Sequence, residues 1–330
     1  MPLKAVPRGK TFVYLECGSP VCLQLYGPQM ARDAHALGVT LRLVPQGSTP
    51  SSITSAWDLA ATMSPAPAVV IGGGTPLSTV APQIKELEAK KVPVMGFGTG
   101  AFNTATGTDF PGVDMDVNDT NYLESETRLA MDWIATDAKG AAENVLWVTI
   151  PDYRVFTYTK PAGEKELAAV CPKCSVTTVS ADATDIGSGI PQDVVSAIQR
   201  NTNIKYVFFD FGDMVDGVPQ ALQAAGLSGK KLVTINGTVL NVQYIKSGEE
   251  AAEVDGSNFY GADLAMDAGM RLVEGQSLSQ DRVGQPVEIV TEAGLNDGAV
   301  HVSHQYGVVD VVPTPNQQQQ FDKLWGIPPQ

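Results

Sequence analysis

The chain repeats one arrangement, short apolar strands alternating with amphipathic helices, first before about residue 120 and again from about residue 144. The first half predicts strands at Thr11–Cys17, Val39–Val44, Ala68–Ile71 and Val92–Phe97. These are short apolar runs closed by Gly, Pro or Ser, which is typical of strands buried on both faces of a parallel sheet. The second half predicts strands at Asn144–Ile150, Val176–Val179, Tyr206–Phe209 and Leu232–Ile235.

Helical periodicity separates these strands. Helices are predicted at Cys22–Leu37, Thr49–Met63, Leu77–Lys90, Glu164–Cys171, Pro191–Arg200 and Pro219–Leu227. Strands alternating with helices in this way favour an α/β fold of two doubly wound, Rossmann-like lobes with parallel sheets. Two similar lobes require a cleft between them.

Length and composition agree with two globular lobes. At 330 residues the chain suits two domains, and 43% hydrophobic with 18% charged residues is a globular composition. The tail after Val311 is predicted to run along the surface, held by Phe321, Leu324 and Trp325. Its run Gln317–Gln320 is interpreted as a solvated turn.

A formal net charge of −14 argues against a nucleic-acid partner, because binding phosphates needs a basic stripe and the Lys and Arg residues here are scattered singly. No stretch approaches the roughly 18 apolar residues of a membrane span. Met1–Lys10 is too short and polar to hold the apolar region of a secretory signal. A mature exported protein whose signal had been replaced by a starting Met would begin in the same way.

The four cysteines form two close pairs, Cys17 with Cys22 and Cys171 with Cys174. Even numbers in local pairs favour disulfides in an oxidising compartment, and free structural thiols are the alternative. A shared metal site is disfavoured because the two pairs are expected at distant edges of different lobes. A redox role is disfavoured because Cys171 follows a helix, whereas reactive thiols lie at helix N-termini.

Ligands of open α/β sheets bind beyond the carboxyl ends of the strands. The loops expected there combine small residues, single polar side chains and aromatic rings, a mixture that suits a small ligand with hydroxyls and apolar faces. The candidate ligand-binding residues are Ser19, Val21, Gly74, Thr75, Thr99, Phe102, Asn103, Tyr153, Arg154, Phe156, Asp210, Phe211, Asp213 and Asn236.

Catalytic interpretations of these loops are weaker. Gly72–Gly74 and Gly96–Gly100 have neither the dinucleotide nor the P-loop spacing and are interpreted as tight turns. Asp210 and Asp213 are interpreted as turn formers or ligand acceptors, and Phe97 and Phe209 are expected in the core. His35, His301 and His304 are the only histidines and none falls in a cleft loop. We therefore expect no enzyme activity, cofactor or metal.

The order of these features resembles the type I periplasmic binding proteins of the ribose-binding class, the solute-binding components of ABC importers. The resemblance covers almost the whole chain. It runs from the opening strand Lys10–Gly18 through Val92–Val94, Gly163–Ala169 and the strand with its turn at Val233–Thr238, to Gly261–Gly275 and Val287–Thr291. The spacing Cys17–Cys22 looks typical of an actinobacterial subgroup.

The resemblance implies discontinuous lobes joined by three crossovers, near Asp116–Tyr122, Glu253–Tyr260 and Val290–Gly294. The first lobe would comprise 1–120 with about 256–291, and the second about 121–255 with 292–330. It also implies hinge closure on a small solute in the cleft and a membrane permease as partner. The implied location is extracytoplasmic, in the periplasm or at the cell surface, where a lipid anchor is one way to hold such a protein. We expect a monomer.

Departures from the family pattern fall on the ligand loops. Ser19–Cys22 stands where sugar binders usually carry an Asn-Pro-Phe-Phe-like stretch, Gly98–Thr99 replaces an Asp-Arg pair, and Asn236 replaces an Asp. Losing charged groups removes strong hydrogen bonds to sugar hydroxyls. A sugar, a polyol, a related cyclic compound, and an aromatic or steroid-derived acid bound through Arg154 therefore all stay open.

Two other classes remain as alternatives to a transport receptor. A ligand-sensing regulator of the lactose-repressor type would need a DNA-binding segment of some 60 residues, and only about ten precede the first strand here. An α/β enzyme would need a general base or a cofactor loop, which the sequence does not reveal.

Overall fold

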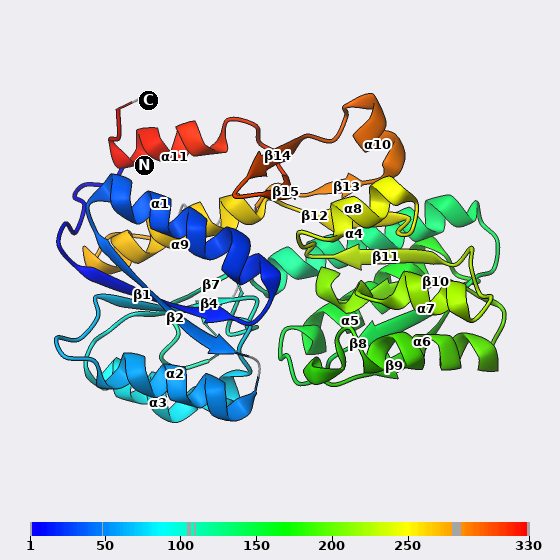
Figure 1. Ribbon diagram of the computed structural model, residues 1–330, viewed down its shortest axis with the longest axis horizontal. Coiled ribbons are helices and arrows are strands. Elements are labelled where there is room, and N and C mark those ends of the chain that lie inside the picture. Colours follow the sequence, from blue (N-terminus) through cyan, green and yellow to red (C-terminus); the bar gives the residue numbers. More distant parts are fainter. Residues whose placement is uncertain (1, 48, 104–106, 109, 279–284, 329–330) are drawn as a thin grey trace.

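The computed structural model describes residues 2–47, 49–103, 107–108, 110–278 and 285–328, with the backbone alone at 102–103 and 107–108. Two α/β lobes lie side by side, and the last elements of the chain extend along one edge of both (Figure 1). This is the architecture that the repeated strand–helix pattern predicts.

The first lobe is built on a five-stranded sheet in the order β2-β1-β3-β4-β7, with all strand pairs parallel. The inner strand β1 is buried along almost its whole length, as expected for a strand covered on both faces. The strands are β1 (Thr11–Cys17), β2 (Thr40–Gly47), β3 (Val69–Gly73), β4 (Val94–Phe97) and β7 (Met115–Val117). A separate small hairpin pairs β5 (Phe102–Asn103) with β6 (Gly107–Thr108).

Helices cover both faces of this sheet (Figure 1). One core layer joins Phe12 and Ile71 to α1 and α9, and the other joins Val13 and Val70 to α2 and α3. The covering elements are the π-helical turn η1 (Cys22–Tyr26), α1 (Gly27–Leu37), α2 (Pro50–Thr62), α3 (Leu77–Ala89) and α9 (Asn258–Val273).

Local sequence explains how α2 is placed. The Thr49 hydroxyl accepts from Ser52 N and the Ser52 hydroxyl accepts from Thr49 N, which is a capping box. The helix then lays Trp57 across β3 at Gly72, where a Cβ atom would lie 2.3 Å from the indole ring. Gly72 is therefore required by close packing of helix on sheet rather than by the backbone angle.

The second lobe has a six-stranded sheet in the order β13-β12-β11-β10-β8-β9. All pairs are parallel except β12 with β13, so the parallel prediction is wrong for this edge strand. The strands are β8 (Asn144–Thr149), β9 (Ser175–Ser180), β10 (Ile204–Phe209), β11 (Lys231–Ile235), β12 (Ala252–Asp255) and β13 (Glu288–Val290).

Two core layers again sandwich the sheet. One joins Trp147 and Phe208 to α4 and α5, and the other joins Val207 and Phe209 to α6 and α7. The helical elements of this lobe are α4 (Thr120–Ala138), α5 (Phe156–Val170), η2 (Ala183–Asp185), α6 (Gly189–Arg200), η3 (Gly212–Val215), α7 (Val218–Ala224), α8 (Asn241–Ser247) and α10 (Glu292–Asp297).

Three links join the lobes before the tail. The first lies between β7 and α4 at 118–119, the second between β12 and α9 at 256–257, and the third is the return from α9 to β13 across 274–287. The crossover predicted at Val290–Gly294 is wrong, because this segment joins β13 to α10 and Val290 packs in the core beneath α8. Of the true third link, 279–284 lie outside the described residues.

The tail departs further from the predicted division. The hairpin of β14 (Val302–Gln305) and β15 (Val308–Val311) contacts α8 and α9, and α11 (Gln317–Trp325) then packs on α9 of the first lobe. Residues 292–330 therefore do not all belong to the second lobe. The Gln run opens α11 rather than forming a solvated turn, with Gln317 buried, and Phe321 and Trp325 anchor the helix as predicted.

Both cysteine pairs are disulfides, Cys17–Cys22 in the first lobe and Cys171–Cys174 in the second. Their Cα atoms lie 5.6 and 5.4 Å apart, within the usual range for the bond. Among the described residues, no helix is long and apolar enough to cross a membrane.

Candidate functional site

A cavity of about 460 Å³ lies between the lobes. Its lining comes from the loops after β1, β3 and β4 in the first lobe and after β8, β9, β10 and β11 in the second. The parallel strands of both sheets thus present their carboxyl ends to one shared space, as expected for open α/β sheets.

Eight of the fourteen candidate residues line this cavity. The first lobe supplies small or apolar residues, and the second supplies three rings and two polar side chains. These eight are Ser19, Val21, Gly74, Tyr153, Phe156, Phe211, Asp213 and Asn236.

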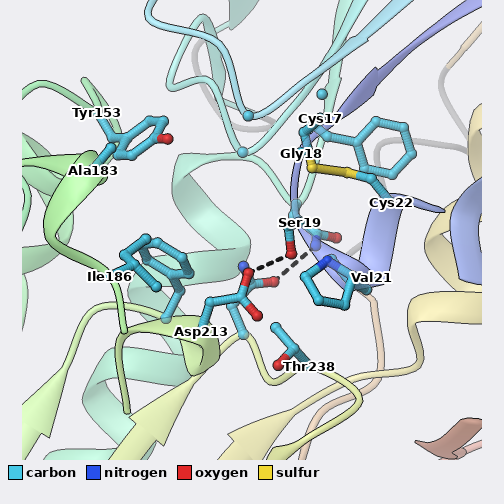
Figure 2. Close-up of a pocket in the computed structure, with 18 of the residues that line it drawn as sticks. Cys17, Gly18, Ser19, Val21, Cys22, Tyr153, Ala183, Ile186, Asp213 and Thr238 are labelled. Atoms are coloured by element: carbon cyan, nitrogen blue, oxygen red, sulfur yellow. Dashed lines mark hydrogen bonds between the residues drawn. A yellow bond between two sulfur atoms is a disulfide. The ribbon is translucent and has the colours of Figure 1, made fainter. Parts of the chain in front are cut away.

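A hydrogen bond closes across the cavity between the lobes. The Ser19 hydroxyl, in the loop after β1, donates to Oδ2 of Asp213, in η3 of the second lobe (Figure 2). Burial raises the pKa of Asp213, while the hydroxyls of Ser19 and Thr238 lower it. The two lobes therefore meet at a carboxyl group that faces the cavity.

Aromatic rings form one wall of the cavity on the second lobe. Phe156 and Phe211 stack with their centroids 5.7 Å apart and planes 9° apart, and Tyr153 meets both edge-on at 6.0 and 6.1 Å. Opposite them, Tyr26 and Phe97 pack 4.9 Å apart. Phe97 lies in the core as predicted, yet it also lines the cavity. Ring faces of this kind bind the apolar faces of cyclic ligands.

Amide side chains form the floor beside the hinge. Asn118 Nδ2 donates to Asn236 Oδ1 at 3.0 Å, and Gln285 Nε2 donates to Asn118 Oδ1 at 2.9 Å. Asn258 Nδ2 donates to Gly237 O at 3.1 Å and Tyr26 Oη donates to Asn258 Oδ1 at 2.6 Å. The floor therefore connects both lobes with the segments on which they pivot.

Two candidate residues, Thr75 and Thr99, are buried behind the cavity loops. The Thr75 hydroxyl donates to Gly73 O at 2.9 Å and contacts Gln46. The Thr99 hydroxyl accepts from Ala101 N, and the Thr99 backbone N–H donates to Asp116. Both residues shape loops and neither lines the cavity.

Arg154 also lies outside the lining. Its Nε donates to Gly100 O at 3.0 Å, and its Nη2 donates to Tyr158 Oη at 2.6 Å. Gly100 has φ of +71° and so close an approach to Val155 that a Cβ would lie 2.7 Å from Val155 N. The guanidinium therefore links the two lobes at the edge of the cavity and does not point into it.

Asp210 ends β10 beneath the cavity and is fully buried. Its Oδ1 accepts from Trp147 Nε1 at 2.8 Å, and burial raises its pKa to about 7. Phe102 and Asn103 form β5, and their side chains lie outside the described residues.

Acidic side chains are the charged part of the lining. Asp213 and Asp216 are the carboxylates, and no Lys, Arg or His is among the described lining residues. A further group of buried carboxyls lies behind the floor: Glu126 Oε2 accepts from Asn236 N, and Asp310 Oδ1 accepts from Asn258 Nδ2. Burial raises the pKa of Glu126 to about 8 and that of Asp310 to about 7.

Sequence reasoning missed a second set of lining residues. Gly98 lies in a loop that was predicted to line the cavity but was not itself named as a candidate. The others come from the hinge and from segments that were not assigned to cavity loops: Tyr26, Asn118, Leu123, Ala183, Thr184, Ile186, Asp216, Leu240 and Asn258. Ala183–Ile186 follow β9, so the rule of strand ends could have found them. Asn118 and Asn258 flank the crossovers, and only the hinge prediction pointed toward them.

Catalytic groups are sparse around the cavity. No histidine lines its described part, and the Ser19 hydroxyl donates directly to the Asp213 carboxyl with no imidazole between them. Within the described ranges, no three His, Cys, Asp or Glu side chains are arranged to hold a metal ion.

No known family model matches this sequence, and no curated protein matches it. Solved structures do match. GanP, a glucose-galactose binding protein from Geobacillus stearothermophilus, is 15% identical with a TM-score of 0.71, over 87% of this chain and 99% of that one. An ABC transporter solute-binding protein from Agrobacterium vitis, with bound allitol, is 15% identical with a TM-score of 0.74, over 88% and 98%.

A carbohydrate transporter solute-binding protein from Agrobacterium radiobacter, in complex with D-arabinose, is 18% identical with a TM-score of 0.69, over 89% of this chain and 98% of that chain. Near-complete coverage of these proteins means that both lobes and their connections are shared. The chain therefore has the fold of the type I periplasmic binding proteins.

Proposed function

We propose that this protein is the extracytoplasmic solute-binding component of an ABC importer. It binds a small hydroxylated compound, a sugar, a polyol or a related cyclic molecule, in the cavity between the lobes. It acts as a receptor and not as an enzyme. Closure of the lobes around the solute presents the form that the membrane permease recognises.

One observation carries this proposal: the cavity combines ring walls and single polar groups from both lobes. The second lobe contributes the stack of Phe156 on Phe211, and the amides of Asn118 and Asn236 meet at the hinge. Ring faces next to amide and hydroxyl groups suit a cyclic compound that has apolar faces and polar edges. A solute in contact with both lobes favours the closed state.

The structural neighbours support the same solute class. The proteins from Agrobacterium vitis and Agrobacterium radiobacter carry allitol and D-arabinose, a polyol and a sugar. The lining argues against an aromatic or steroid-derived acid, because Arg154 uses its guanidinium on Gly100 and Tyr158. A ligand carboxylate would instead face Asp213 and Asp216.

The disulfides support the proposed location. Structural disulfides persist in oxidising compartments outside the cytoplasm, and Cys17–Cys22 closes the loop that carries Ser19. We infer that the partners are the solute and a permease, and that the receptor works as a monomer, which light scattering tests directly.

Thermal unfolding against a panel of sugars, polyols, cyclitols and aromatic acids tests the proposal. A ligand at 100 times its Kd adds about 2.7 kcal/mol to the free energy of unfolding, and hence several degrees to Tm. We expect a shift with hydroxylated compounds and none with the acids. If no compound in the panel shifts Tm and any compound is turned over, the proposal is contradicted and an enzyme is favoured.

A further inference from the structure

The charge of the cavity lining narrows the solute further. Asp213 and Asp216 both belong to the segment after β10, and both face the cavity. Within the described lining no cationic side chain balances them, and Arg154 is held at the rim by Gly100 and Tyr158. A carboxylate that faces an enclosed space without a cationic partner is costly, so a cationic ligand would relieve that cost.

The rings around these carboxylates favour the same kind of ligand. Three rings of the second lobe form one cluster, with centroids no more than 6.1 Å apart: Tyr153, Phe156 and Phe211. The first lobe adds the rings of Tyr26 and Phe97 on the opposite side. Aromatic faces attract cations through their quadrupole, most strongly where water is excluded. Carboxylates together with rings therefore form an environment for an organic cation.

We propose that the cavity selects a hydroxylated solute that carries a protonated amine, and that Asp213 binds this amine. The inference rests on the proposed function and narrows its substrate class to amino sugars and amino polyols. Figure 2 shows Asp213 directed toward Ser19 across the cavity, with Thr238 on one side and Ile186 on the other. An ammonium at this point joins the groups that already hold the two lobes together.

The remaining polar groups suit the hydroxyls of such a solute. Asn118 and Asn236 present amides at the floor, and Thr184 and Thr238 add hydroxyls at the second-lobe side. Amides and hydroxyls both donate and accept, so they complement hydroxyl groups without a preference for charge. In this proposal Asp213 and Asp216 select for the charge of the solute, and the amide and hydroxyl residues recognise its hydroxyl groups.

A group of buried carboxyls lies behind the floor of the cavity. Glu253 Oε1 lies where a Cβ of Gly237 would be, 1.1 Å from that position, and neither oxygen of Glu253 has a hydrogen-bond partner among the described residues. Burial raises the pKa of Glu253 and of Asp255 well above their ordinary values, next to Glu126 and Asp310. A cation brought into the cavity favours the ionised forms of these acids and releases protons.

Matched pairs of ligands test the proposal in isothermal titration calorimetry. Glucamine is compared with glucitol, and galactosamine with galactose and N-acetylgalactosamine, which keeps the nitrogen but loses the charge. We expect the amine of each pair to bind about 10- to 100-fold more tightly than its neutral partner, the usual range for a charge-assisted hydrogen bond. Repeating the titration in buffers of different ionisation enthalpy should reveal proton release for the amines alone.

Two variants locate the effect. Asp213→Asn keeps the shape of the side chain and an oxygen that accepts from the Ser19 hydroxyl, but it removes the charge. The Kd values of the amine and of its neutral partner should then lie within about threefold of each other. Asp193→Asn removes one negative charge from an exposed position on α6 and should keep the preference of the wild type. Tm of each variant without ligand checks that both are folded.

The pH dependence gives a second readout that needs no variant. Ser19 and Thr238 contact Asp213, and Asp216 and Tyr153 are the titratable groups that face it. Because burial raises the pKa of Asp213, its ionised fraction grows as pH rises above its ordinary range. Amine affinity should therefore increase as pH rises above the range in which an ordinary Asp ionises, while the affinity of the neutral partner changes less.

The outcomes separate the two proposals. Equal or tighter binding of the neutral partners overturns the cationic solute. A preference for the amine that persists in Asp213→Asn overturns Asp213 as its binding group. Both outcomes leave the solute-binding function in place. Failure of every amine also overturns the cationic solute, and a hit among neutral sugars or polyols would then still support the receptor. Failure of amines and neutral compounds alike counts against both.

Discussion

The two lobes share a fold but present different chemistry to the cavity. The first lobe contributes small residues and loop backbone around Ser19, Gly74 and Gly98, braced by the Cys17–Cys22 disulfide. The second lobe contributes the ring cluster and the carboxylate of Asp213. The charged groups and the three-ring cluster of the described lining thus lie in the second lobe, and we propose that charge selection resides there.

The largest expected difference is in the stability lost when each of two glycines, which line the cavity from opposite lobes, is replaced by alanine. A Cβ on Gly237 would lie 1.1 Å from Glu253 Oε1, within a fully buried group of carboxyls. Gly237→Ala should therefore lower the free energy of unfolding by about 3 kcal/mol, as expected for overpacking in a rigid core. Urea unfolding followed by circular dichroism measures the change.

Gly74→Ala is the matched first-lobe change. Its Cβ would meet only Cys17 Cβ at 3.6 Å, so the cost comes from its φ of +50° and should be about 1 kcal/mol. Equal losses of stability in the two variants would contradict the inference that the chain is more tightly packed at Gly237 than at Gly74. Adding Glu253→Ala to Gly237→Ala should restore part of the stability.

The two disulfides should separate stability from binding. Loop entropy assigns about 2 kcal/mol to each, because they close loops of similar size with sequence separations of 5 and 3. The Cys17→Ser, Cys22→Ser double variant should lose this stability and also solute affinity, because the bond braces the Ser19 loop. The Cys171→Ser, Cys174→Ser variant should lose stability alone, and calorimetry with a solute identified in the panel distinguishes them.

Substitutions in the aromatic wall should have a smaller effect, which changes solute affinity and not stability. Phe211→Leu keeps apolar volume but removes the ring that stacks on Phe156. It should weaken solute binding about tenfold, the usual range for a lost ring contact. Val21→Ala removes apolar volume from the first-lobe wall and should cost less, so a reversed order would break the comparison between the lobes.

The last expected effect is a slope of stability with pH rather than a loss at one pH. Burial raises the pKa of Glu126 and of Glu250 to about 8, so the folded protein holds protons between about pH 4.5 and pH 8 that the unfolded chain has lost. Stability from these groups is full at low pH and declines as pH rises through 8. Glu126→Gln should flatten this decline by up to about 1.4 kcal/mol per pH unit, measured by Tm from pH 5 to pH 8.5. An unchanged slope would show that Glu126 does not retain its proton.

Periodicity predicted most of the fold because strands buried on both faces must be continuous apolar runs. It did not reveal α4, whose amphipathic pattern over Thr120–Ala138 follows a hinge rather than a strand of its own lobe. It also placed the start of the next helix late, at Glu164, because Pro161 and Gly163 interrupt the pattern, although α5 begins at Phe156. Gly163 is needed where α5 packs closely on Trp147, which only the tertiary structure reveals.

The site was predictable where it depends on strand ends and not where it depends on side-chain direction. Ser19, Asp213 and Asn236 follow strands and line the cavity. Arg154 and Asp210 also follow strands, but Arg154 turns to the rim and Asp210 turns under the sheet to Trp147. Residues two positions apart in a loop can therefore lie on opposite sides of it, and a one-dimensional pattern does not decide between them.

Hydrogen–deuterium exchange with and without a bound solute tests most directly that the solute is held between the lobes. The account predicts simultaneous protection of 17–22 in the first lobe, of 211–216 and 236–238 in the second, and of the links at 118–119 and 256–257. Protection confined to one lobe, or located away from these loops, would contradict it.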